Sequence, residues 1–218
     1  MLEILIKGGI LDAVMIAESI LAWAVVFDRA KAFRENSKVD VRSLRAKVIR
    51  LLRQDDLDGA CKLCANTPGP VSSVLLAGIR AYGRHRAIAS SPEALRALVS
   101  DALEDSTYIA IKAVESRLNV LSFVGNSAPL FGMTGTVTGM IKSFEAMGAA
   151  GALEGAAVAA GVAEALITTA VGLIVAMAAV IPFHYFTSLS GKVESQIHEA
   201  GVELLDFITL HMADKSAK

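Results

Sequence analysis

Gly161-Val-Ala-Glu-Ala-Leu-Ile-Thr-Thr-Ala-Val-Gly-Leu-Ile-Val-Ala-Met-Ala-Ala-Val-Ile-Pro-Phe-His-Tyr185 is a long and almost uncharged run. Between Glu154 and Lys192 the only formally charged residue is Glu164. An apolar run of this length is typical of a transmembrane helix. An ionisable group is energetically costly inside a membrane, so we expect Glu164 to have a function.

One face of this predicted helix consists of small residues. On a helical wheel drawn at roughly 100° per residue, these residues lie within about 80° of Thr169. They are Gly161, Ala165, Gly172 and Ala176. Small side chains allow another helix to come close, so we expect a close helix contact along this face.

Glu164 and Thr168 are four residues apart and share a second face of the same helix. Glu164 lies roughly 140° from Thr169 on a straight helix, so the two side chains cannot both point into one narrow pore. Either one of them faces a neighbouring helix or the helix deviates from a straight path. Pro182 is expected to kink the end of the helix, because its ring removes the hydrogen bond to the carbonyl of Ala178.

A second apolar stretch reads Ala128-Pro-Leu-Phe-Gly-Met-Thr-Gly-Thr-Val-Thr-Gly-Met-Ile-Lys-Ser-Phe144. Together with residues 161–173, it resembles the MotA/TolQ/ExbB proton-channel family, and most closely the ExbB and TolQ branch. The family pattern is Ala-Pro-Leu-x-Gly-x-x-Gly-Thr-Val-x-Gly on one helix and Gly-Ile-x-Glu-Ala-Leu-x-x-Thr-Ala-x-Gly-Leu on the next. Both patterns occur here in order, and a weaker likeness covers residues 19–29.

The resemblance implies a homopentamer whose second and third membrane helices line a central apolar pore. That pore would hold the single membrane helices of a dimer of an ExbD- or TolR-like partner, whose aspartate would be protonated and deprotonated as ions cross. The work would be passed to the cell envelope through a TonB- or TolA-like effector. In this chain the resemblance implies an ion pathway at Thr136 and Thr169, and the buried carboxylate of Glu164 and the hydroxyl of Thr168 are further candidates for it. The small residues Gly161, Ala165, Gly172 and Ala176 are expected to face the pore, because a small face suits a ring in which an inner helix must turn.

The identity of the transported ion stays open at this point. A hydroxyl group can relay a proton by donating and accepting, and its oxygen can also bind a hard cation such as sodium. The resemblance favours H+, whereas Thr168 keeps Na+ as the alternative. No cofactor is expected beyond the transported ion.

We predict an all-α membrane protein with three transmembrane helices that extend into a cytoplasmic helical stalk. The mean hydropathy of +0.52 is too high for an ordinary soluble domain. The predicted segments are a periplasmic N-terminus (1–9), transmembrane helix 1 (10–28), a cytoplasmic helical domain (29–117), transmembrane helix 2 (118–144), a periplasmic loop (145–155), transmembrane helix 3 (156–186) and a cytoplasmic C-terminal helix (187–218). Basic residues cluster directly after residue 28, so the positive-inside rule places the N-terminus outside the bacterial inner membrane and the C-terminus in the cytoplasm.

Several smaller features give further expectations. Glu18 would lie near mid-membrane, either paired with a neighbouring subunit or facing the bundle interior, with ion conduction as the alternative. Pro129 is expected to bend the second span. The helix that begins with Ser91-Pro-Glu is expected to continue without a break into that span. Cys61 and Cys64 have no second ligand pair nearby and are expected to be small buried residues rather than a zinc site.

The sequence offers no support for an enzyme, because Glu164 has no second carboxylate, metal ligand or nucleophile at a recognisable spacing. The net charge of −1 argues against a nucleic-acid partner. A passive membrane scaffold remains an alternative to a motor. A solute transporter is disfavoured, because such proteins usually contain internal repeats and this chain has none.

Overall fold

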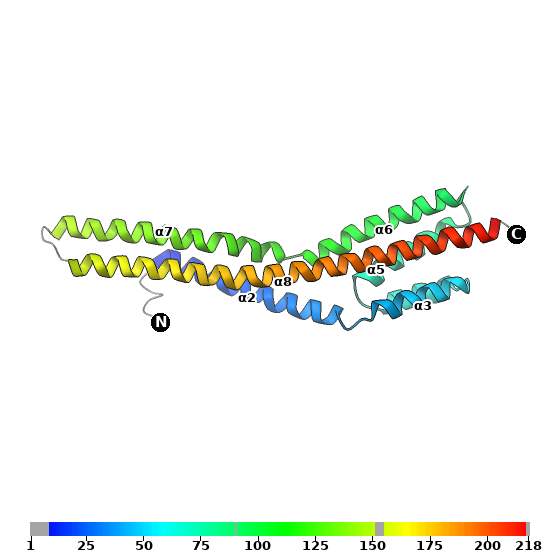
Figure 1. Ribbon diagram of the computed structural model, residues 1–218, viewed down its shortest axis with the longest axis horizontal. Coiled ribbons are helices and arrows are strands. Elements are labelled where there is room, and N and C mark those ends of the chain that lie inside the picture. The colour runs from blue at the N-terminus through cyan, green and yellow to red at the C-terminus, as the bar shows by residue number, and fades with distance from the viewer. Residues whose placement is uncertain (1–8, 90, 151–154, 217–218) are drawn as a thin grey trace. The chain divides into compact units, whose positions relative to one another are not determined.

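The computed structural model describes residues 9–89, 91–150 and 155–216, and in this part of the chain every regular element is a helix. The helices, shown in Figure 1, are α2 (Gly9–Asn36), α3 (Val41–Arg53), α4 (Leu57–Asn66), α5 (Pro70–His85), α6 (Pro92–Glu115), α7 (Leu118–Ala150) and α8 (Gly155–Ser216). The predicted all-α class is confirmed for these residues. They form two compact units, one drawn from 1–30 and 117–186 and the other from 31–116 and 187–218.

The first unit packs most of α2 and α7 with the N-terminal half of α8. Its buried apolar residues recur at helical spacing, for example Met15, Ala22 and Val25 on α2. Large apolar side chains cover much of the outside; they include Ile20, Trp23, Phe27, Leu130, Val137, Leu166, Ile174 and Ile181. An apolar exterior of this extent is typical of a surface that faces lipid or another protein.

One segment of the described chain, Val158–His211, is long and apolar enough to cross a membrane by length and composition. It contains most of the predicted third span. The count of three spans therefore stays a prediction.

The second unit is a helical bundle of α3 to α6 with the C-terminal part of α8. Its core consists of aliphatic residues such as Val48, Leu75, Ile79, Leu95, Val99, Ile197, Leu204 and Ile208. The helix starts have strong caps: Asp56 accepts a hydrogen bond from Gly59 N at 2.8 Å. Ser91 accepts one from Ala94 N at 3.1 Å, and Pro92 is the first helical residue, as predicted.

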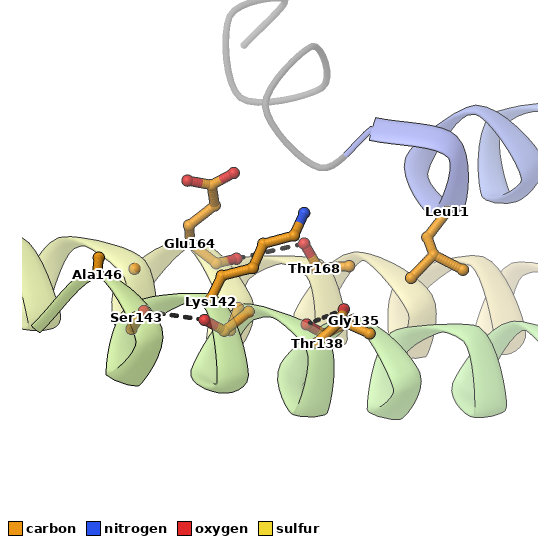
Figure 2. Close-up of a pocket in the computed structure, with 11 residues that line it drawn as sticks. Leu11, Gly135, Thr138, Lys142, Ser143, Ala146, Glu164 and Thr168 are labelled. Atoms are coloured by element: carbon orange, nitrogen blue, oxygen red, sulfur yellow. Dashed lines mark hydrogen bonds between the residues drawn. The ribbon is translucent and has the colours of Figure 1, made fainter. Parts of the chain in front are cut away.

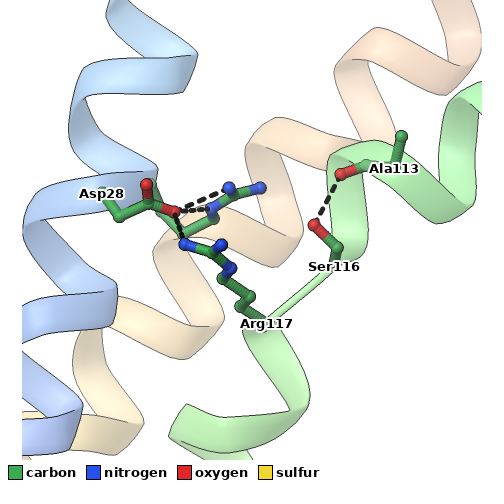
Figure 3. Close-up of polar contacts among 5 residues, drawn as sticks. Asp28, Ala113, Ser116 and Arg117 are labelled. Carbon is green, nitrogen blue, oxygen red and sulfur yellow. Dashed lines mark hydrogen bonds and ion pairs between the residues drawn. The ribbon is translucent and has the colours of Figure 1, made fainter.

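The expected continuous helix from Ser91 into the second span is wrong. Helix α6 ends at Glu115, Ser116 has an extended ψ of 140°, and Arg117 has a left-handed φ of +68°. A left-handed backbone costs a non-glycine residue roughly 1 kcal/mol, so the surrounding structure must hold it. Figure 3 shows one contact of this residue: the Arg117 guanidinium lies 3.1 Å from Asp28 Oδ2.

Other boundaries differ less from the prediction. Helix α7 continues to Ala150, so part of the expected loop 145–155 is helical, and residues 151–154 lie outside the described residues. Helix α8 passes through the predicted boundary at residue 186 without a break, as expected for a span that continues into the C-terminal helix. Pro129 and Pro182 both lie inside continuous helices, and the kinks expected there stay predictions.

Candidate functional site

Helices α7 and α8 lie against each other along their small residues. A Cβ atom added to Gly172 would lie 2.7 Å from the carbonyl oxygen of Ala128 and 3.1 Å from the Cα of Gly132. A Cβ added to Gly139 would lie 2.8 Å from that of Ala165. The close approach expected of this face is therefore present, and the neighbouring helix is α7 of the same chain.

That Gly161, Ala165, Gly172 and Ala176 face the pore of a ring stays a prediction. Within one chain, Ala165, Gly172 and Ala176 are buried, and Gly161 is half-buried beside Ser143. A face of small residues is the place where two helix backbones can come closest. In this chain α7 covers most of that face.

Thr169 joins the two helices by a hydrogen bond. Its hydroxyl donates to the carbonyl oxygen of Gly132 on α7 at 2.8 Å. Thr136 lies one turn further along α7, half-buried, and its hydroxyl donates to Met133 of its own helix at 2.7 Å. The two threonines that match the family pattern thus lie on the contacting helices, and no hydrogen bond links their hydroxyls in the described chain.

Glu164 and Thr168 line a cleft beside this contact, and they share one face of α8 as predicted. The cleft has a volume of about 240 Å³. Figure 2 shows Thr138, Lys142 and Ser143 of α7 on its other side, with Leu11 of α2 at one end. Thr168 is buried and donates to the Glu164 carbonyl oxygen at 3.2 Å, whereas the Glu164 side chain is half-buried.

This arrangement answers the geometric question raised by the sequence. Thr169 faces the neighbouring helix α7, and Glu164 faces the cleft at the edge of the same helix pair. A straight helix therefore accommodates both the Thr169 and the Glu164 side chains. The site is therefore a tight helix contact with a polar cleft along one side.

Glu18 of α2 faces the interior of the first unit. Its side chain is 7% exposed, and its Oε1 accepts a hydrogen bond from the Ser127 hydroxyl at 2.6 Å. Its other oxygen is buried with no hydrogen-bond partner among the described residues. Of the positions expected for Glu18, the structure shows the one inside the bundle, and a role in conduction stays untested.

Two residues of these sites, Lys142 and Ser127, were not predicted from the sequence. Lys142 could have been found, because it is the first charged residue after Arg117 and lies inside the stretch that carries the family pattern. Ser127 gave no such signal. Its role depends on which residue of α2 lies opposite it, and helical spacing within α7 does not contain that information.

The two cysteines lie in the second unit, in α4. Burial raises the pKa of the Cys64 thiol to about 11, and the neighbouring Cys61 adds to the shift. Burial also raises the pKa of Cys61. Both thiols are therefore protonated and weakly nucleophilic at neutral pH, as expected of small buried residues. The described residues contain no group of three or more metal-ligating side chains.

The described chain is helical, and one of its segments is long and apolar enough to cross a membrane. A model of the MotA/TolQ/ExbB proton channel family matches residues 67–199, which is more than half of the chain. The chain belongs to this family, as its resemblance indicated.

Its relatives carry two kinds of name. The Tol-Pal system protein TolQ of Pseudomonas aeruginosa is 31% identical over 180 residues, which cover 81% of this chain and 76% of that protein. The biopolymer transport protein ExbB of Pseudomonas putida is 28% identical over 86% of this chain and 55% of that protein. TolQ of Haemophilus influenzae is 26% identical over 96% of this chain and 92% of that protein. These names agree with the ExbB and TolQ branch.

Proposed function

We propose that this chain is the ring-forming channel subunit of a motor in the bacterial inner membrane, driven by the ion-motive force. Five copies form the ring, and a dimer of an ExbD- or TolR-like single-span protein occupies the pore. Proton flow through this complex powers work on the cell envelope, such as energised outer-membrane import or envelope maintenance, through a TonB- or TolA-like effector. The N-terminus is periplasmic and the C-terminus cytoplasmic.

The observation that carries this proposal is the family match over residues 67–199, which includes both polar membrane helices. The names of the relatives, from a Tol-Pal system and from biopolymer transport, support an envelope task. The apolar exterior of the first unit is consistent with lipid and further subunits around it.

Within this proposal, Glu164 shapes the ion path and the partner's aspartate is the main proton carrier. The Glu164 side chain is half-buried on the cleft and makes no ion pair among the described residues. It is therefore available to a group from another chain. The Thr169 hydroxyl donates its hydrogen to the Gly132 carbonyl, and its oxygen can still accept a hydrogen bond. To relay a proton, the hydroxyl would accept one proton and release the hydrogen that it now donates to Gly132.

Two alternatives have specific support. The hydroxyl oxygens of Thr138, Thr168 and Ser143 around one cleft are ligands of the type that sodium prefers, which favours a sodium-driven version of the motor. The hydrogen bond from Thr169 to Gly132 is a packing contact in its own right, which favours a non-conducting scaffold. Function measured against external sodium at fixed pH, and against a protonophore at fixed sodium, separates these three cases.

Native mass spectrometry of the full chain, extracted with its partners from the membrane, tests the assembly. The proposal predicts five copies of this chain with two copies of a smaller single-span protein. The Glu164→Ala variant is predicted to keep this mass while motor function is lost. A stable monomer or dimer of the wild-type chain would contradict the proposed ring.

A further inference from the structure

The cleft beside Glu164 contains a lysine to which the proposed function gives no role. Lys142 lies on α7 near the end of the predicted second span, and Figure 2 shows its side chain extending toward Thr168 on α8. It is the basic residue among the side chains that line the cleft. The Lys142 side chain is exposed at the edge of this cleft, whose walls carry both polar and apolar side chains.

The walls of the cleft present oxygen atoms as acceptors. Thr138, Ser143 and Thr168 each use their own hydroxyl hydrogen for a carbonyl of their own helix, at 3.0, 2.9 and 3.2 Å. The lone pairs of these hydroxyl oxygens therefore remain available as acceptors. With the carboxylate of Glu164, they form a set of oxygen atoms of the kind that binds a small hard cation.

The ammonium group of Lys142 competes with such a cation. It donates up to three hydrogen bonds and accepts none, so it suits the same oxygen acceptors. It also repels a free cation electrostatically. Because the Lys142 side chain is exposed, solvent screens this repulsion, and the repulsion is expected to lower cation occupancy roughly fivefold.

We infer that Lys142 determines ion specificity by acting as a tethered cation that keeps sodium out of the cleft. This inference deepens the proposed function and rests on it for its meaning in the cell. The binding property itself belongs to the chain, and it can be measured without any motor activity. A sodium site is therefore expected in this protein, and the charged side chain of Lys142 keeps sodium from binding there.

The test measures binding of radioactive sodium, by equilibrium dialysis, to the purified full chain in lipid nanodiscs. The Lys142→Gln variant is expected to bind sodium roughly fivefold more tightly than the wild type. Lys142→Arg keeps the charge and is expected to behave as the wild type does. The double variant Lys142→Gln/Glu164→Gln is expected to lose the gained affinity, because the carboxylate of the site is gone. Lys112→Gln is the matched control, since Lys112 lies on α6 over the Tyr108 ring and does not line the cleft.

Equal and weak sodium binding by the wild type and Lys142→Gln would overturn the inference, and would mean that Lys142 only reaches the membrane surface. Tight binding by Lys142→Arg would overturn it as well, because charge would then not be the cause. Lys142→Met removes the same charge and serves as a second variant if Lys142→Gln does not fold. Sodium binding by Lys142→Gln without proton flux in the wild-type complex would uphold the inference and contradict the proposed function. Proton flux in the wild-type complex without sodium binding by Lys142→Gln would uphold the proposed function and contradict the inference.

Discussion

Replacing Gly172 by alanine tests whether the contact between α7 and α8 holds the first unit together. The added Cβ would lie 2.7 Å from the carbonyl oxygen of Ala128, 3.1 Å from the Cα of Gly132 and 3.3 Å from its nitrogen. All three are backbone atoms, so no side-chain rotation can relieve the clash. The two helices would have to separate instead.

The size of the effect follows from these distances. The nearest contact is about 0.7 Å shorter than an ordinary van der Waals contact. Overpacking of this kind costs about 1–3 kcal/mol. Alanine is favoured over glycine within a helix by up to about 1 kcal/mol, which offsets part of the cost. We expect Gly172→Ala to lower the free energy of unfolding by about 1–2 kcal/mol.

The measurement is reversible unfolding in mixed micelles, followed by circular dichroism as the denaturing detergent fraction is raised. Gly191→Ala is the matched control, because Gly191 lies on the same helix and a Cβ there meets no atom within 4 Å. This control is expected to be as stable as the wild type or more stable. If Gly172→Ala unfolds at the same point as Gly191→Ala, the packing argument for the helix pair is refuted.

Three further predictions concern single side chains. Thr169→Val removes the hydrogen bond to Gly132 and is expected to lower the free energy of unfolding by about 0.5–1.5 kcal/mol in the same assay. Thr169→Ser keeps the hydroxyl and should be nearly neutral. Equal losses of stability in the two variants would contradict a role for the hydroxyl. If the ion is H+, Thr168→Ala should impair motor function mildly and Thr136→Ala severely, and the opposite order in an envelope-function assay would contradict the assigned pathway. Folding raises the pKa of the Cys64 thiol from near 9 to about 11, so stability is expected to fall as the pH rises through this range. Thermal melts at a series of pH values measure this fall. A Cys64→Ala variant that shows the same fall would count against the thiol as its cause.

The sequence predicted those features that depend on a single helix, such as where it starts and which residues share a face. The apolar run around Glu164 predicted the N-terminal part of α8, and Ser91 with Pro92 predicted the start of α6. The shared face of Glu164 and Thr168 also followed from helical spacing, and both residues do line one cleft.

Contacts between helices could not be predicted in the same way. The small-residue face of α8 indicated a close neighbour but could not distinguish α7 of the same chain from a pore or another subunit. The break at Arg117 had no glycine or proline to mark it, although Arg117 takes a left-handed backbone. Ser127 gained its partner Glu18 only when α2 and α7 came together, and Lys142 lines a cleft that α2, α7 and α8 form together.

In the proposed function this chain conducts protons together with a partner, and Glu164 is needed for the flux. The decisive experiment measures proton flux into liposomes that contain the wild-type complex or the Glu164→Ala complex, at fixed sodium and with a pH gradient as the driving force. We expect flux for the wild type and strongly reduced flux for Glu164→Ala at the same complex mass. Equal flux from the two complexes, or no flux from the wild type, would contradict the proposed function.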